Sequence, residues 1–277
     1  MKRLLLLAII SISLASCKSE FEKIRTSGDV DRIYTKAMAY YEAEEYQKAQ
    51  ALFEIIISSY RGKREAEDIY FKYAYTYYHL EQFILAAYYF KNFSTTYGTS
   101  ELREEADFMS AYANYQLSPT FRLDQQYTIE AIEGFQLFVN TYPNSDRVEQ
   151  CNKLIDAMRA KLELKAYKAA ELYYDLQDYQ SAIQSFENVL KDFPDTQNRV
   201  EIGYMIIRSA YLLAKNSFVE KQKERFTDAV ERASEFLERY SDSRYADEVQ
   251  KMYEQSTDQL KELENVRYQD ESSGVGS

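Results

Sequence analysis

The feature that most constrains the fold is an alanine followed four residues later by a phenylalanine, which recurs along the chain. It occurs in YQKAQALFEII, FILAAYYFKNF, TIEAIEGFQLF and YQSAIQSFENV, and a fifth segment, FTDAVERASEF, carries two alanines before its phenylalanine. An aromatic residue and a turn follow each segment. The pairs are Ala49 and Phe53, Ala86 and Phe90, Ala131 and Phe135, Ala182 and Phe186, and Ala229, Ala233 and Phe236. A repeat of this kind predicts stacked units that each contact their neighbours.

A second small residue lies upstream of each of these segments. These upstream residues are Ala37, Ala74, Ala111, Ala170 and Ala210. Two antiparallel helices approach closely only where side chains are small, so we expect each upstream alanine to face the downstream one. The pattern resembles the tetratricopeptide repeat. With only 7 Gly and 3 Pro, it predicts an all-α, right-handed superhelical solenoid of five tetratricopeptide-like helix hairpins with a C-terminal capping helix.

The same pattern divides the chain. We expect a lipoprotein signal peptide at 1–16, an N-terminal linker at 17–28 and repeats one to three at 29–145. A long helix, repeats four and five and the capping helix should occupy 146–266, and a disordered tail 267–277. The long helix should run for about 30 residues after the third repeat, since that stretch lacks glycine and proline.

The first residues have the pattern of a secretory signal. Lys2 and Arg3 precede an apolar run from Leu4 to Leu14, which is too short to span a membrane, and Leu-Ala-Ser-Cys follows. This resembles the bacterial lipobox, which implies lipidation of Cys17 and, with lysine next, an anchor in the outer membrane. The alternative is an ordinary secreted protein with a chance cysteine.

Composition argues against several functions. The net charge of −11 disfavours nucleic acid, whose binding needs basic side chains. One histidine and one cysteine besides Cys17 are too few for a usual zinc site. We find no phosphate-binding loop or nucleophile elbow. We therefore expect no enzyme and no cofactor other than covalent lipid. Cys151 is expected to be a buried residue on a helix, with a reactive thiol as the alternative.

The segment YFKYAYTYYHL, residues 70–80, is rich in rings. The repeat register predicts that Tyr70, Tyr73, Ala74 and Tyr77 face the companion helix. A second stripe, with its counterparts in repeats one and three, should line a concave groove. The predicted groove residues are Tyr34, Met38, Tyr41, Phe71, Tyr75, Tyr78, His79, Phe108, Tyr112 and Tyr115. Tyrosine is enriched at protein interfaces, so this pattern favours peptide docking. The alternative is that the chain fills its own groove.

Two segments indicate which family of tetratricopeptide-repeat proteins the chain resembles. AIEGFQLFVNTYPNSDRVEQ and KLELKAYKAAELYYDLQDYQSAIQSFENVLKDFPDT resemble the BamD family, the lipoproteins of the β-barrel assembly machinery. The resemblance covers roughly residues 28–250 and rests on Tyr142 to Ser145, Ala170 to Tyr174 and Asp192 to Thr196.

The resemblance implies a function. Members sit on the periplasmic face of the outer membrane, bind a BamA-like barrel protein through the C-terminal repeats and receive C-terminal strands of unfolded outer-membrane proteins in the N-terminal repeats. The chain would then be an assembly factor, both scaffold and receptor. The alternative is a periplasmic tetratricopeptide lipoprotein that coordinates cell-wall synthesis.

Overall fold

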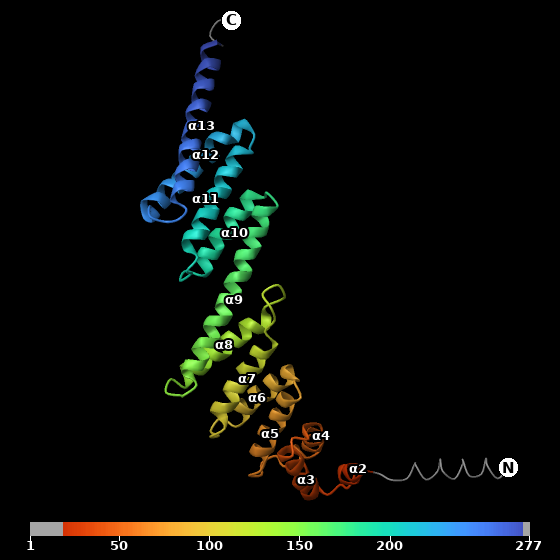
Figure 1. Cartoon of the computed structure of the whole chain (residues 1–277). Helices are drawn as coiled ribbons and strands as arrows, with labels where there is room; N and C mark the ends of the chain where they lie inside the picture. The colour runs from red at the N-terminus through yellow and green to blue at the C-terminus, as the bar shows by residue number, and fades with distance from the viewer. Residues whose placement is uncertain (1–18, 274–277) are drawn as a thin grey trace, which may run out of the picture. The chain divides into compact units, whose positions relative to one another are not determined.

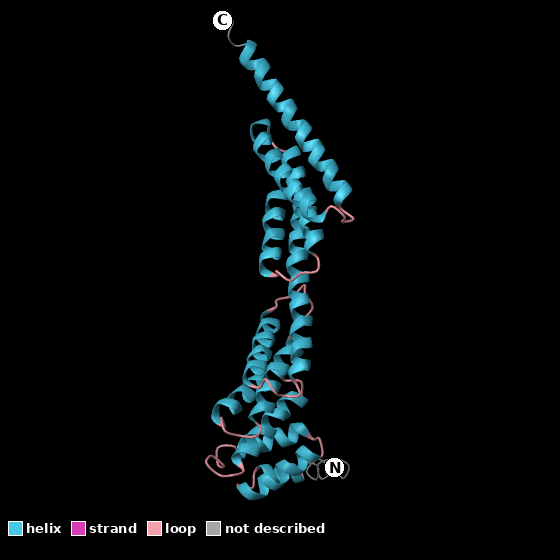
Figure 2. Ribbon diagram, turned by 90° about the vertical axis from the view of Figure 1, so that its left-hand side faces the viewer, coloured by secondary structure: helices cyan, strands magenta, loops and turns pink. Residues whose placement is uncertain are grey.

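The structure is a computed structural model that describes residues 19–273 (Figure 1). These residues form helices joined by turns and loops, without a strand (Figure 2). The helices are α2 (Glu20–Arg25), α3 (Val30–Glu42), α4 (Tyr46–Ile56), α5 (Ala66–His79), α6 (Phe83–Thr96), α7 (Arg103–Leu117), α8 (Gln126–Thr141), α9 (Val148–Asp175), α10 (Tyr179–Asp192), α11 (Arg199–Lys215), α12 (Val219–Tyr240) and α13 (Ala246–Ser273).

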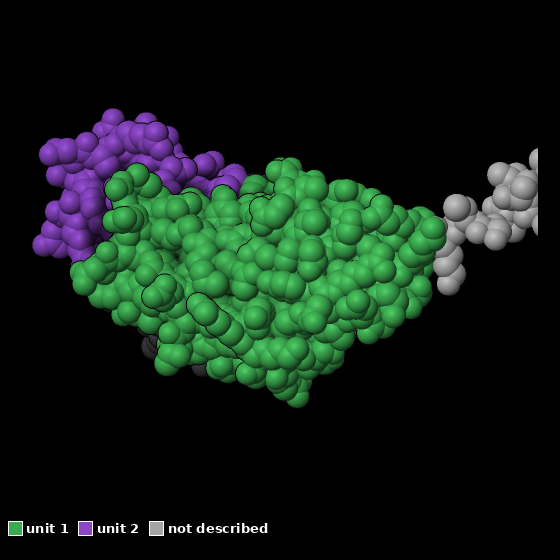
Figure 3. Space-filling model, turned by 90° about the horizontal axis from the view of Figure 1, so that it is seen from below, with its two compact units in different colours: residues 1–158 green, residues 159–277 purple. Residues whose placement is uncertain are grey.

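The chain divides after Met158 into two compact units (Figure 3). In unit 1, α3 pairs with α4, α5 with α6 and α7 with α8, and each pair packs on the next. In unit 2, the second part of α9 packs with α10, α11 pairs with α12, and α13 packs on both α11 and α12. The prediction of an all-α stack of helix hairpins with a helix at its C-terminal end is confirmed.

Small residues let the paired helices approach. The upstream alanines are at most 2% exposed, and so are Ala49, Ala86, Ala131, Ala182, Ala229 and Ala233. The phenylalanines of the repeat, Phe53, Phe90, Phe135 and Phe186, are fully buried. Each of them contacts a ring on the first helix of its own hairpin. Complete burial of such a side chain contributes about 1.5–3 kcal/mol. In unit 2 the cluster around Phe186 also contains Ile202 and Ile206 of α11, so packing between neighbouring hairpins adds to the packing within each one.

Three of the hairpins close with the same tight turn. Glu44, Glu81 and Gln177 have left-handed backbones, with φ of 57°, 57° and 61°. In the second repeat, the Gln82 N–H donates to the Tyr77 carbonyl at 2.9 Å and the Glu81 N–H to the Tyr78 carbonyl at 3.0 Å. This is the Schellman arrangement, which usually has glycine at the left-handed position.

The third and fifth repeats are longer than the others, and their extra residues take different forms. In the third repeat, residues 118–125 form a loop. The side-chain amide of Gln125 holds this loop in place, because it donates to the carbonyls of Thr120 and Leu123 at 2.8 and 2.9 Å. In the fifth repeat the extra residues lengthen α12, which begins at Val219. Lysine and glutamate in that stretch favour helix over loop.

Some boundaries differ from those predicted. α13 continues to Ser273, past the predicted end at Val266, because no glycine or proline interrupts it before Gly274. α2 lies within the predicted linker, where the Ser19 side chain accepts from the Glu22 N–H and begins the helix. The signal peptide, Cys17 and residues 274–277 lie outside the described residues.

Candidate peptide-binding face

The predicted groove residues lie on the first helices of repeats one to three. Tyr34, Met38 and Tyr41 are on α3, Phe71, Tyr75, Tyr78 and His79 on α5, and Phe108, Tyr112 and Tyr115 on α7. All ten belong to unit 1. We call this set the ring row.

Rings of the row contact one another across repeats. His79 stacks on Tyr46 of α4, with ring centroids 4.2 Å apart and an angle of 8° between the planes. His79 also contacts Tyr78 at 5.9 Å, and Tyr78 contacts Tyr112 at 6.3 Å. Tyr112 in turn lies 5.6 Å from Tyr115. The rings therefore form a continuous series from the first repeat to the third.

Tyr75 is held in place rather than free. Its hydroxyl donates to Glu105 Oε1 at 2.6 Å, and its ring packs edge-on against Phe90 with centroids 4.9 Å apart. The other carboxylate oxygen of Glu105 accepts from Arg147. Burial, and then the bond to Glu105, raise the pKa of Tyr75 far above its ordinary value. The half-buried ring is therefore a neutral support of the row.

Phe108 is the member of the row whose predicted exposure is wrong. It is only 2% exposed. The Arg147 guanidinium covers one side of its ring at 4.1 Å, and Phe135 and Phe138 lie 5.8 Å away. Helical periodicity places Phe108 on the correct stripe of α7. It does not reveal that Arg147, from the turn before α9, lies over the ring.

His79 is the exposed member of the row. Burial lowers the pKa of its imidazole, against the opposite effect of Glu44. Because the ordinary pKa is near 6.5, the ring is mostly uncharged at neutral pH. An uncharged imidazole stacked on a tyrosine offers a flat apolar surface with two polar nitrogens.

Two further rings belong to the face and were not predicted. Tyr46 and Phe83 each begin the second helix of a hairpin, three residues before its alanine. Tyr46 packs edge-on against Tyr41 with centroids 5.7 Å apart, and Phe83 against Tyr78 at 5.5 Å. The repeat register would have identified them, since both occupy the same repeat position.

The same contact occurs in unit 2, where Tyr174 lies 5.7 Å from Tyr179. These pairs span the tight turns, so Tyr41 and Tyr78 also stabilise the hairpins. Burial raises the pKa of Tyr41 to about 12. The ring at this repeat position has a structural function even where nothing docks.

The remaining members are half-buried. Tyr34 packs on Tyr60 with centroids 5.3 Å apart, and Phe71 on Phe93 at 5.2 Å. Met38 and Tyr115 also keep part of their surface open. The row thus offers ring edges and partial faces on a rigid support. It suits shallow apolar contact with an extended or helical peptide, because its rings lose little conformational entropy on binding.

Residues 19–273 contain no group of three or more His, Cys, Asp or Glu that could hold a metal ion. No helix of that part is both long and apolar enough to cross a membrane. Cys151 is fully buried on α9, as predicted, and burial raises the pKa of its thiol to about 11.

The fold and the ring row define a helical-repeat scaffold with an aromatic face. A family model described as outer membrane lipoprotein (YfiO) matches residues 27–203. The chain belongs to this family of outer membrane lipoproteins, which is the BamD family that the sequence resembles.

Among solved structures, a similar one comes from Podosopora anserina and is described as nearly identical TPR-like repeats attributed to a kinesin light chain. Its sequence identity is 12% and its TM-score 0.33, with 76% of this chain and 96% of that chain covered.

Proposed function

We propose that this outer membrane lipoprotein is a BamD-like assembly factor, a periplasmic scaffold and receptor that helps insert β-barrel proteins. The observation that carries the proposal is the family match over 27–203, which extends through repeats one to four. The scaffold of helix hairpins and the aromatic face of unit 1 support a protein that binds partners. The lipid on Cys17 would anchor it at the periplasmic face of the outer membrane.

In this proposal the ring row receives the C-terminal strand of an unfolded barrel protein. An aromatic side chain of the strand would pack on the half-exposed rings of His79, Tyr78 and Tyr112. The tyrosine hydroxyls at the edge of the row can stay hydrated or bond to the strand backbone. Phe108 and Tyr75 support the row from below and make no contact with the strand.

A peptide-binding measurement tests the ring row. The probe is a synthetic peptide with a barrel protein's last strand, ending in phenylalanine. Replacing His79 and Tyr112 together by alanine should weaken its binding about tenfold or more, since an aromatic contact at an interface centre is worth about 1–2 kcal/mol or more. Tyr173→Ala, which removes a ring that is 42% exposed in unit 2, is the matched control. Equal affinities of all three proteins would contradict the ring row as receptor.

A second experiment tests the cellular function. We propose that unit 2, with the C-terminal repeats, binds a BamA-like barrel protein. Affinity purification from membranes should recover that barrel protein, and depletion should lower the amounts of outer-membrane β-barrels. Recovery of peptidoglycan synthases with normal barrel levels would instead indicate a coordinator of cell-wall synthesis.

A further inference from the structure

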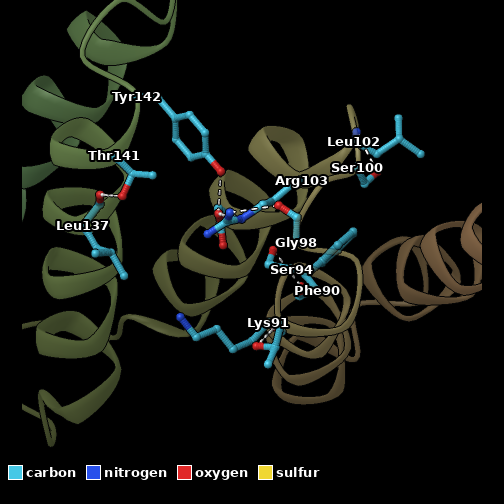
Figure 4. A network of polar contacts seen from close by, with 12 residues as sticks. Phe90, Lys91, Ser94, Gly98, Ser100, Leu102, Arg103, Leu137, Thr141 and Tyr142 are labelled. Atoms are coloured by element: carbon cyan, nitrogen blue, oxygen red, sulfur yellow. Dashed lines mark hydrogen bonds and ion pairs between the residues drawn. The ribbon is translucent and has the colours of Figure 1, made fainter.

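A cleft of about 840 Å³ lies between α6 and α8, with α7 as its floor. None of the ring-row residues lines it. Figure 4 looks into this region: Lys91 of α6 points towards α8, and Arg103 at the start of α7 lies between the two helices. The cleft is part of unit 1 alone, so its shape depends only on repeats two and three.

The repeat register explains why the cleft is open. In repeat two, Tyr73 and Tyr77 of α5 and Tyr89 of α6 form a cluster. Tyr77 stacks on Tyr89 with centroids 4.7 Å apart, Tyr73 lies 5.0 Å from Tyr89, and the hydroxyls of Tyr73 and Tyr77 are 2.7 Å apart. Tyr73 and Tyr77 are 3% and 8% exposed.

Repeat three has no ring at these three positions. Counting from the alanines of each hairpin, Tyr73, Tyr77 and Tyr89 correspond to Ser110, Asn114 and Gly134. All three of these smaller residues line the cleft. The cleft therefore lies at the repeat positions that carry the tyrosine cluster in repeat two.

The fifth repeat shows another way to close this space. There the residue corresponding to Gly134 is Arg232, whose Nη1 lies 2.7 Å from Glu187 Oε1 of α10 and whose Nε lies 2.8 Å from Asp228. The arginine thus bridges the two second helices. No ion pair between α6 and α8 is found in the described residues. Of these three repeats, only the third leaves the space unfilled.

The floor of the cleft is small and partly polar. The Ser110 hydroxyl donates to the Ala87 carbonyl at 3.0 Å. Asn114 makes no side-chain hydrogen bond within residues 19–273, so its amide can bond to a ligand. At Gly134 the helices are in close contact, since a Cβ there would lie 2.8 Å from the Ala111 Cβ.

The walls of the cleft carry exposed apolar side chains, whose burial by a partner would be favourable. Ile84, Tyr88 and Leu137 are 56%, 58% and 55% exposed. Their burial against a partner would remove apolar surface from water at about 25 cal/mol per Å². Charge differs along the rim: Glu130 and Glu133 lie on α8, and Lys91 lies on α6.

One end of the cleft is rigid. Arg103 donates to the Gly98 carbonyl at 3.0 Å and lies 3.6 Å from Asp107, which accepts from the Tyr142 hydroxyl at 2.8 Å (Figure 4). Arg103 and Asp107 offset each other's charge, although Arg103 Nε is buried without a hydrogen-bond partner in residues 19–273. Of the remaining charged side chains of the cleft, the two carboxylates Glu130 and Glu133 outnumber the one ammonium of Lys91.

We propose that this cleft binds a helical segment of a partner protein that presents two aromatic side chains one turn apart and a basic residue beside them. The two aromatic rings of the partner would enter the cleft of repeat three, at the positions that correspond to Tyr73, Tyr77 and Tyr89 of repeat two. The basic residue of the partner would face Glu130 and Glu133. Helical residues four apart lie on one face, which is the spacing of Tyr73 and Tyr77. α6 has 14 residues, so the cleft accommodates about three to four helical turns.

The residues of the given sequence that lie outside the described part do not supply such a segment. Residues 1–18 and 274–277 contain no aromatic side chain. A second copy is disfavoured because each chain carries a net charge of −11 and the cleft rim is itself acidic. A basic partner segment is favoured for the same reason.

The test uses two labelled peptides of about 16 residues, or roughly four turns. Both have an Ala, Gln and Lys host sequence; one has two tyrosines four residues apart, the other two serines. Fluorescence anisotropy with the full-length protein should show about tenfold tighter binding of the tyrosine peptide. Equal binding of the two peptides would overturn the proposal.

Variants locate the binding. Asn114→Tyr restores a floor ring and should weaken binding of the tyrosine peptide about tenfold. Ile84→Ala should also weaken it, whereas Leu85→Ala should not. Leu85 is 43% exposed on the same helix and does not line the cleft, which makes it the matched control. Glu133→Lys should weaken binding through the basic residues of the peptide.

The other possible outcomes of these experiments also support or overturn binding in the cleft. If Asn114→Tyr does not fold, the Ile84→Ala and Leu85→Ala pair carries the test. Equal effects of that pair would overturn the assignment to the cleft. Self-association of the unmodified protein in sedimentation experiments that Asn114→Tyr abolishes would replace the partner helix by a second copy. The ring-row test uses other residues and a strand peptide, so either result stands without the other.

Discussion

Repeats two and three have the same hairpin architecture and the same buried alanines. They differ in what lies beside the second helix of each hairpin. In repeat two a tyrosine cluster fills the space beside α6. In repeat three, serine, asparagine and glycine leave a cleft beside α8. The comparison shows that a repeat keeps its fold through a few alanine and phenylalanine positions. The other positions are free to supply either extra core or a surface for a partner.

The largest expected effect comes from making repeat two resemble repeat three. Tyr73→Ser with Tyr77→Asn removes two almost fully buried rings. Truncating buried aromatic side chains costs about 3–5 kcal/mol each, so we expect a loss of at least about 3 kcal/mol. Urea unfolding followed by circular dichroism measures it. A loss below about 1 kcal/mol would mean that the cluster adds little to the core.

The close approach at Gly134 gives the next effect. Gly134→Ala places a methyl group 2.8 Å from the Ala111 Cβ, and overpacking of this kind costs about 1–3 kcal/mol. Gly98→Ala is the control, because its nearest neighbour, the Ser94 carbonyl oxygen, is 4.0 Å away. Thermal unfolding of both variants would contradict this reasoning if Gly98→Ala were the more destabilised.

Alkaline pH should distinguish the two repeats. Burial raises the pKa of Tyr77 to about 12 and raises that of Tyr73 still further. A folded pKa above the unfolded value near 10 means that the stabilisation is complete below pH 10 and is lost as pH rises towards 12. The urea midpoint should therefore fall over this window. In Tyr73→Ser with Tyr77→Asn the fall should be smaller, and an equal fall would contradict the prediction.

The smallest expected effect is a gain in stability. Glu81 has a left-handed backbone with φ of 57°, which glycine adopts without steric cost. Glu81→Gly should therefore raise the free energy of unfolding by about 0.5–1 kcal/mol. Glu42→Gly, within the last turn of α3, should lower it by a similar amount. Urea unfolding compares the two, and a loss in both would mean that the turn is not strained.

Much of the fold could be predicted because the alanine and phenylalanine positions have one function in every repeat. A small residue is needed wherever two paired helices meet, and a buried ring fills the core beside it, so the period shows both. The inward positions of Tyr73 and Tyr77 follow from the same register. The ends of helices depend on weaker local signals, and the extension of α13 was missed for that reason.

The candidate site was predicted less well. Whether Phe108 is open depends on Arg147, which is distant in sequence, and the support of Tyr75 depends on Glu105. The cleft was missed because a motif search looks for residues that are present, whereas this feature consists of rings that are missing. A comparison of repeats position by position would have indicated it.

The burial of Cys151 allows the ring row and the cleft to be labelled selectively. It is the only cysteine besides Cys17, and with a pKa of about 11 its thiolate fraction at neutral pH is only about one in ten thousand. A new surface thiol can therefore be labelled with a maleimide dye while Cys151 stays unmodified. Fluorophores attached separately through Glu44→Cys, beside His79, and Leu85→Cys, beside the cleft, would then report on the ring row and the cleft without removing a side chain of either.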